Sequence, residues 1–233
     1  MQNAQDNLDE PTPTESAPPH AHPIPLTANQ ERKLVDYLDG QLLEITRNYK
    51  KRSQPSTALP TLASYLTATH TILSLVLQIP PAGPSSYLRT SFLLRLTGEV
   101  LNSISGYTPD AEALSQLLSW LEDLDKGWLA VLNGETWDTV ERIGIETSLP
   151  DEPARSTIVS QTDRTRLRSI LIAGTNRLEE WLAELEAPDQ NFQSALDKLG
   201  LQQDFEDLFS RTLSAMGSLD GSMNDPGGMT GTC

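Results

Sequence analysis

The 233-residue sequence contains one cysteine, Cys233, at its last position. An intramolecular disulfide is therefore excluded, which favours a reducing compartment. No Asn-X-Ser/Thr glycosylation acceptor occurs, and the N-terminal residues lack the basic and then apolar run of a signal peptide. We therefore expect the protein to be cytoplasmic, nuclear or both.

Long apolar runs are also lacking. Residues 53–88 contain no Asp, Glu, Lys or Arg, in a chain in which 21% of the residues are charged. Threonines, serines and His70 dilute the apolar residues of this segment, whereas a membrane-spanning helix needs about 20 predominantly apolar residues. We therefore expect that residues 53–88 do not span a membrane. The segment either contains a helix surrounded by its neighbours or forms part of a docking surface.

Basic residues are scarce relative to acidic ones, with 17 Lys and Arg against 32 Asp and Glu and a formal net charge of -15. Residues 27–108 carry eight basic and five acidic residues, whereas residues 109–233 carry nine basic and twenty-three acidic ones. Affinity for a nucleic acid backbone comes from Lys and Arg, so we expect nucleic acid to be bound only indirectly, if at all. The acidic half is suited to a protein partner with a basic surface, although a bias toward solubility also explains it.

Alternating β-strand patterns are nearly absent, because no such β-branched run reaches six residues. Apolar residues instead recur three or four positions apart, as in amphipathic helices. The sequence predicts an all-α fold with a single bundle of about six helices in residues 27–216 and an internal linker near 146–158. The composition predicts a disordered, acidic, Pro-rich arm at 1–26 and a flexible Gly/Ser-rich tail at 217–233.

Start and stop signals place the helix boundaries. Thr27 and Gln30 form a capping-box pattern, and Ser160 with Asp163 forms a second N-cap. Asn133-Gly134 predicts a helix end. A short helical piece is expected around Trp137 to Ile145. Helices are expected to begin near the following residues: Thr27, Pro60, Ser86, Thr108, Ser160 and Phe192.

Signatures of catalysis are missing as well. The sequence contains no P-loop, dinucleotide-binding, zinc-protease, nucleophile-elbow or EF-hand pattern, so we expect no catalytic residue, cofactor or metal. His20 and His22 supply only two potential ligands, in the predicted arm. His70 is the only histidine in the predicted folded region, on a Thr-rich helix where a bond to a hydroxyl or exposure to solvent is expected.

Five residues are candidates for binding a partner. Arg164 and Arg168 occupy the first turns of a predicted helix, where the helix dipole disfavours cations, so they are either neutralised by neighbouring acids or held for an acidic partner. Glu180 and Glu184 belong to an acidic group on the outer side of the same helix. Trp120 lies off the main apolar stripe of its own helix, where a tryptophan can anchor an interface or fill the core.

A basic cluster, Arg47, Lys50, Lys51 and Arg52, closes the first predicted helix. Cations at this position interact favourably with the negative end of the helix dipole. The same cluster is also a candidate basic patch for phosphate or nucleic acid, or a weak nuclear-import signal.

These features favour a noncatalytic intracellular helical adaptor, or a subunit of a multiprotein complex, that binds one or more proteins. The first alternative is a nuclear factor that associates with nucleic acid through the local basic patches around Arg47 and Arg164. The second alternative is an enzyme with an unrecognised helical active site around His70. A helical bundle hosts many unrelated functions, so the fold does not choose between them.

Overall fold

The computed structural model of the chain describes residues 24–146, 159–184, 196–198 and 200–220. The arm predicted at 1–26 lies outside these residues except for 24–26, and most of the linker predicted near 146–158 lies outside them as well. Of the tail predicted at 217–233, residues 217–220 are described and are helical, and the rest lies outside.

The described part of the chain is mostly helical, which confirms the all-α prediction. It contains seven α-helices, a short 3-10 helix (η1) and two three-residue strands. The elements in chain order are α1 (Ala28–Lys50), α2 (Leu62–Leu77), α3 (Gly83–Ser103), η1 (Ile104–Gly106), α4 (Ala111–Asn133), β1 (Thr136–Asp138), β2 (Ile143–Ile145), α5 (Gln161–Ala183), α7 (Gln202–Glu206) and α8 (Ser210–Asp220).

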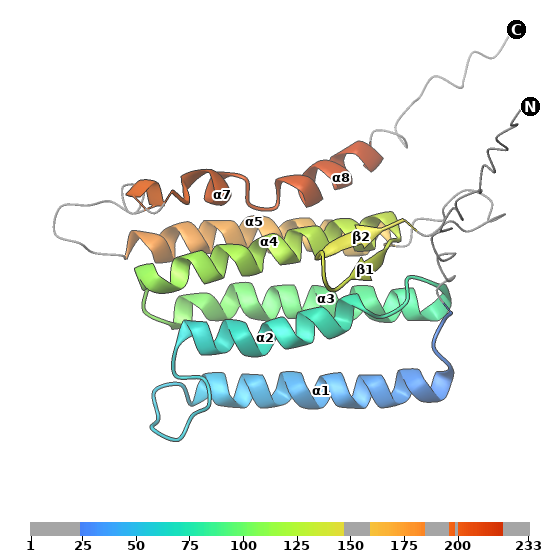
Figure 1. Cartoon of the computed structure of the whole chain (residues 1–233), viewed down its shortest axis with the longest axis horizontal. Helices are drawn as coiled ribbons and strands as arrows, with labels where there is room; N and C mark the ends of the chain where they lie inside the picture. Colours follow the sequence, from blue (N-terminus) through green and yellow to red (C-terminus); the bar gives the residue numbers. More distant parts are fainter. Residues whose placement is uncertain (1–23, 147–158, 185–195, 199, 221–233) are drawn as a thin grey trace, which may run out of the picture.

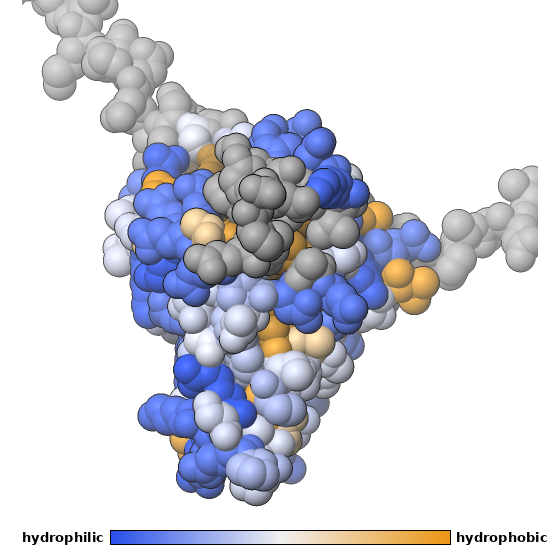
Figure 2. Space-filling view, turned by 90° about the vertical axis from the view of Figure 1, so that its left-hand side faces the viewer, coloured by the Kyte–Doolittle hydropathy of each residue, from blue (hydrophilic) through white to orange (hydrophobic). Residues whose placement is uncertain are grey.

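The long helices lie roughly side by side along the longest axis of the molecule (Figure 1). α1 forms one edge of the stack, and α7 and α8 form the opposite edge, against α4. α4 is the central element, because it contacts α2, α3, α8 and both strands. Seen end-on, the body narrows toward α1, and most of the visible surface is hydrophilic with small separate apolar patches (Figure 2).

Local capping sets most of the predicted helix ends. The capping box of Thr27 and Gln30 is confirmed at the start of α1, and the Ser160 side chain accepts from the Asp163 N–H at the start of α5. α4 ends at Asn133 and is capped by Gly134, whose φ of 71° is a left-handed conformation that glycine adopts without steric cost. None of the helices in the described ranges combines the length and apolarity that a membrane crossing requires.

The helical piece predicted around Trp137 to Ile145 is wrong, because these residues form an antiparallel β-hairpin. Thr136 pairs with Ile145, and Asp138 pairs with Ile143. The Asp138 carboxylate accepts the N–H groups of two turn residues, Val140 and Glu141, and so turns the chain back. β-branched residues in both short strands suit this extended conformation.

A buried arginine supports the base of the hairpin. Arg89 on α3 is 1% exposed, and its NH1 group donates to the carbonyl oxygen of Glu135 at 2.7 Å. Burial lowers the pKa of the Arg89 guanidinium to about 10, because a low-dielectric environment disfavours the charged form. Even so, Arg89 stays charged at neutral pH and ties α3 to the residue that follows α4.

Three tyrosines pack together where the end of α1, the start of α2 and the residue after η1 meet. The rings of Tyr49, Tyr65 and Tyr107 lie 5.7 to 5.8 Å apart in tilted pairs, a favourable aromatic geometry. Burial raises the pKa of the Tyr107 phenol to about 12. The Trp181 indole N–H donates to the backbone carbonyl of Tyr107 at 2.6 Å, which connects α5 to this cluster.

Within the described ranges, one hydrogen bond joins two fully buried side chains: Trp128 on α4 donates its indole N–H to Thr97 Oγ1 on α3 at 3.0 Å. Thr97→Val keeps the shape of the side chain but removes this acceptor. We expect urea denaturation to show a loss of about 1–3 kcal/mol in the free energy of unfolding, the cost of a buried donor without an acceptor. Thr71→Val, on the exposed face of α2, is the matched control and should change the free energy by less than about 0.5 kcal/mol. Equal losses in the two variants would contradict this assignment.

Candidate protein-binding groove

Two buried aspartates on α4 position the elements around it. Asp123 and Asp125 are 5% and 4% exposed. They are two residues apart, so their side chains leave the helix about 200° apart, toward opposite sides. A buried carboxylate must be hydrogen-bonded to be tolerated, and each of the two obtains its donors from a different part of the fold.

Asp123 joins α2 and the hairpin to α4. His70 Nε2 lies 3.0 Å from Asp123 Oδ2, and Arg142 NH1 donates to the same oxygen at 2.9 Å. Because an ionised carboxylate only accepts, His70 must carry a proton on Nε2. His70 therefore has an acidic partner 53 residues away instead of the expected hydroxyl, while its side chain stays 34% exposed, so the expected exposure to solvent is met in part.

The structure supplies only part of the arrangement that an enzyme around His70 would need, namely a histidine bonded to a carboxylate. A nucleophilic triad requires a hydroxyl or thiol within hydrogen-bond reach of the histidine. In the described part of the chain, the hydrogen bond to Asp123 is the only one that His70 makes through its ring. The described residues also contain no group of three or more His, Cys, Asp or Glu side chains placed to hold a metal ion.

Asp125 holds the start of α8. Its Oδ1 accepts the backbone N–H of Thr212 at 3.1 Å, and its backbone carbonyl accepts from Thr212 Oγ1 at 3.2 Å. Phe209, just before α8, is 1% exposed and has a φ of 58°. This left-handed conformation is unfavourable for a bulky residue and separates α7 from α8, and the burial of the ring offsets its cost.

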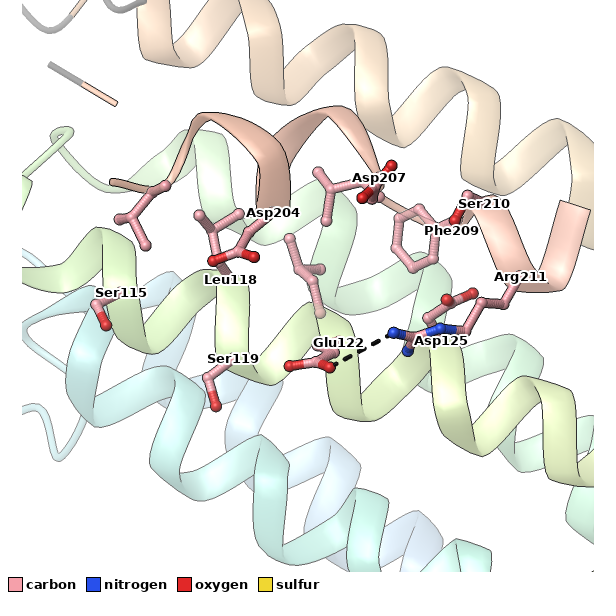
Figure 3. A pocket seen from close by; sticks show the side chains of 13 residues that line it. Ser115, Leu118, Ser119, Glu122, Asp125, Asp204, Asp207, Phe209, Ser210 and Arg211 are labelled. Atoms are coloured by element: carbon pink, nitrogen blue, oxygen red, sulfur yellow. Dashed lines mark ion pairs between the residues drawn. The ribbon is translucent and has the colours of Figure 1, made fainter. Parts of the chain in front are cut away.

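A groove lies between α4 and the α7–α8 segment, with a volume of about 340 Å³ (Figure 3). Eight of its 13 lining residues are polar or charged, and five are apolar. The polar and charged residues are Ser115, Ser119, Glu122, Asp125, Asp204, Asp207, Ser210 and Arg211. The apolar residues are Leu118, Leu121, Leu201, Leu208 and Phe209.

The rim of the groove is acidic on both walls. Glu122 on α4 is exposed, as are Asp204 on α7 and Asp207 just after it. Arg211 is the one cation among the lining residues, and its NH2 group lies 3.8 Å from Glu122 Oε1. With Asp125 included, the lining carries a formal charge of -3. The groove therefore favours a cationic ligand over an anionic one.

The predicted partner-binding residues on α5 fall into two groups. Arg168, Glu180 and Glu184 are exposed, as a partner surface requires. Arg164 is 5% exposed, and its Nε donates to the carbonyl oxygen of Val159 at 3.1 Å, so it braces the segment before α5.

Trp120, the predicted partner-binding residue on α4, is 3% exposed and belongs to the core cluster, as expected if this residue fills the core.

The basic cluster is also divided by the fold. Arg47, Lys50 and Lys51 are exposed at the end of α1. Arg52 is half-buried, stacks over the Tyr49 ring at 4.6 Å and donates from Nε to the Gly106 carbonyl at 2.6 Å. Arg52 therefore holds α1 against η1, and three of the four cations remain on the surface.

The sequence interpretation did not identify the groove. Glu122 is more than 80 residues from Asp204 in the chain, and no local pattern joins them. The available signal was the pair Asp204 and Asp207, whose spacing of three residues places two carboxylates on one side of a short helix.

Comparison with known proteins identifies a family. A family model described as TFB6, subunit 11 of the general transcription factor TFIIH, matches residues 71–217. The match covers 147 of the 233 residues and includes the hairpin, both buried aspartates and every residue that lines the groove. α1 and the first part of α2 lie outside it. No curated protein and no solved structure matches the chain.

The bond between Asp125 and Thr212 predicts how α8 is attached. Asp125→Ala leaves the buried Thr212 N–H without its acceptor, at a cost of about 1–3 kcal/mol. Hydrogen–deuterium exchange should therefore accelerate roughly 10- to 100-fold at the amides of α8, and less in α2 and α3. Asp125→Asn retains an acceptor oxygen and should restore much of the protection. Uniform acceleration across all helices would show that Asp125 does not act on α8 in particular.

Proposed function

The chain belongs to the TFB6 family of TFIIH-associated proteins, and on this premise we propose that it is a noncatalytic helical subunit or adaptor that acts through protein–protein contacts. The description of the family names a subunit of a general transcription factor and no catalytic activity. Since a general transcription factor acts on genes, the proposed site of action is the nucleus.

The observation that carries the proposal is the open acidic groove within the family-matched part of the chain. Its mixed lining, with an apolar floor below a charged rim, is the composition of a protein-binding surface. Small-molecule pockets are lined predominantly by apolar and aromatic side chains, and this groove is not.

The charge distribution favours protein contacts over direct contacts with nucleic acid. Arg52 and Arg164 are engaged inside the fold, which leaves smaller basic patches than the sequence suggested. The acidic residues Glu180 and Glu184 on α5 remain exposed and add a second surface suited to a basic protein. We propose that nucleic acid is reached only through TFIIH.

Retention of purified TFIIH by the immobilised full-length chain tests this function. The wild-type chain should retain TFIIH in stoichiometric amounts, also after nuclease treatment. Failure of the wild-type chain to retain TFIIH, or retention that depends on nucleic acid, would overturn the proposal.

Charge reversal tests the surface on α5. We expect Glu180→Lys with Glu184→Lys to weaken TFIIH retention roughly three- to tenfold, because each exposed charge contributes up to about 1 kcal/mol. Arg168→Glu, on the same helix, tests the cationic part of this surface, and its weakening should be smaller. Circular dichroism should show unchanged helix content, since all three side chains are exposed.

The matched control is Asp36→Lys with Glu44→Lys on α1. It changes the net charge by the same amount, at exposed positions outside the family-matched part of the chain. This control should retain TFIIH like the wild type. Equal weakening in both double variants would leave only a general effect of net charge and would remove α5 from the proposed interface.

A further inference from the structure

We propose that the groove between α4 and α7–α8 binds a basic amphipathic helix, about ten residues long, supplied by a protein of TFIIH. This inference rests on the proposed function and adds the chemistry of the partner. The length of the groove limits the length of the occupant, the floor requires apolar side chains, and the rim requires cations.

The length of the groove fits a short helix. Its α4 wall extends from Ser115 to Asp125, which is about 15 Å at a rise of 1.5 Å per residue. The opposite wall is the α7–α8 segment, so the groove lies between two helical elements (Figure 3). A helix laid into such a groove presents side chains from one face, three or four residues apart. A volume of about 340 Å³ accommodates the side chains of one helix face, with the rest of the helix outside.

The floor requires apolar side chains from the occupant. Leu201 and Leu208 are only partly buried, although both pack against the core cluster. Leu118 and Phe209, next to them, are 6% and 1% exposed. An apolar side chain placed over the two partly exposed leucines would remove their remaining surface from water, which is favourable.

The rim requires cations from the occupant. Asp204 and Asp207 lie one helical turn apart, and like charges at this spacing repel each other. Asp207 accepts a hydrogen bond from Gln203, but among the described residues neither carboxylate has a salt-bridge partner. A Lys or Arg side chain between them would relieve the repulsion and form charge-assisted hydrogen bonds.

On the α4 wall, by contrast, cations of the chain itself already face the acidic residue. Arg211 reaches across the groove toward Glu122, at 3.8 Å, and Lys126 lies 2.9 Å from the same Glu122 oxygen. Glu122 is therefore largely neutralised, and the uncompensated charge of the rim belongs to Asp204 and Asp207. A helix whose cations face Asp204 and Asp207, and whose apolar face covers the leucines of the floor, meets both requirements.

The test measures binding of designed peptides to the full-length protein. The probe is a fluorescent 14-residue helix with leucines along one face and lysines and arginines elsewhere. One control peptide has the same composition in an order that destroys the apolar face, and another has glutamates in place of the cations. Fluorescence anisotropy should show binding of the first peptide alone, which weakens as salt is raised from 50 to 300 mM, roughly the range over which surface charges become screened.

Two variants test whether the groove is the site. Asp204→Asn with Asp207→Asn should weaken binding of the basic helix about tenfold or more, because it removes both unpaired rim charges. Ser119→Arg places a bulky cation in the groove at an exposed position and should weaken binding equally without loss of stability. The control, Asp197→Asn with Glu206→Gln, makes the same change of charge at exposed neighbouring positions outside the lining and should change binding less than about twofold.

The outcomes separate this inference from the proposed function. No binding of the basic helix, equal binding of the scrambled or acidic peptide, or equal effects of the groove and control variants would overturn the inference. If the wild-type chain still retains TFIIH in that case, the proposed function stands without this site. If the peptide binds in the groove but TFIIH is not retained, the groove chemistry is right and its assignment to TFIIH is wrong.

Discussion

The architecture depends on two carboxylates buried on one helix. Charged groups are costly to remove from water, so Asp123 and Asp125 are tolerated only because neighbouring elements supply donors to each. Asp123 takes its donors from α2 and the hairpin, and Asp125 takes its donor from the start of α8. The two side chains leave α4 on opposite sides. Through them α4 fixes the positions of α2 and the hairpin on one side and of α8 on the other. The apolar core supplies stability, and these polar contacts specify which element lies where.

The groove follows from that arrangement. Its walls are α4 and a segment more than 80 residues further along the chain, and the bond between Asp125 and Thr212 anchors that segment beside α4. The left-handed Phe209 turns the chain between α7 and α8 and adds its ring to the floor. The acidic residues on α7 are thereby held opposite those on α4. The groove exists only while α8 is attached to α4. The free energy that holds α8 in place therefore also determines how much of the protein can bind a partner there.

Sequence patterns predicted the helices well where capping is local. Thr27 and Ser160 marked the start of α1 and α5, because an N-cap needs only residues three positions away. The hairpin was missed, because strands of three residues are too short to show alternation, and the turn depends on Asp138 bonding two backbone groups. The pairing of His70 with Asp123 and the walls of the groove were missed for another reason. They join residues 50 to 90 positions apart, and a single sequence carries no signal of such contacts.

The central claim is that this TFIIH-associated protein acts by binding another protein in the groove built on α4. Photo-crosslinking tests it most directly, with a photoreactive amino acid at Ser119 in the groove or, as control, at exposed Gln41 on α1, in the presence of purified TFIIH. The account predicts an adduct from Ser119 to one TFIIH polypeptide, within a segment rich in Lys and Arg, and no such adduct from Gln41. No adduct from Ser119, or equal adducts from both positions, would contradict it.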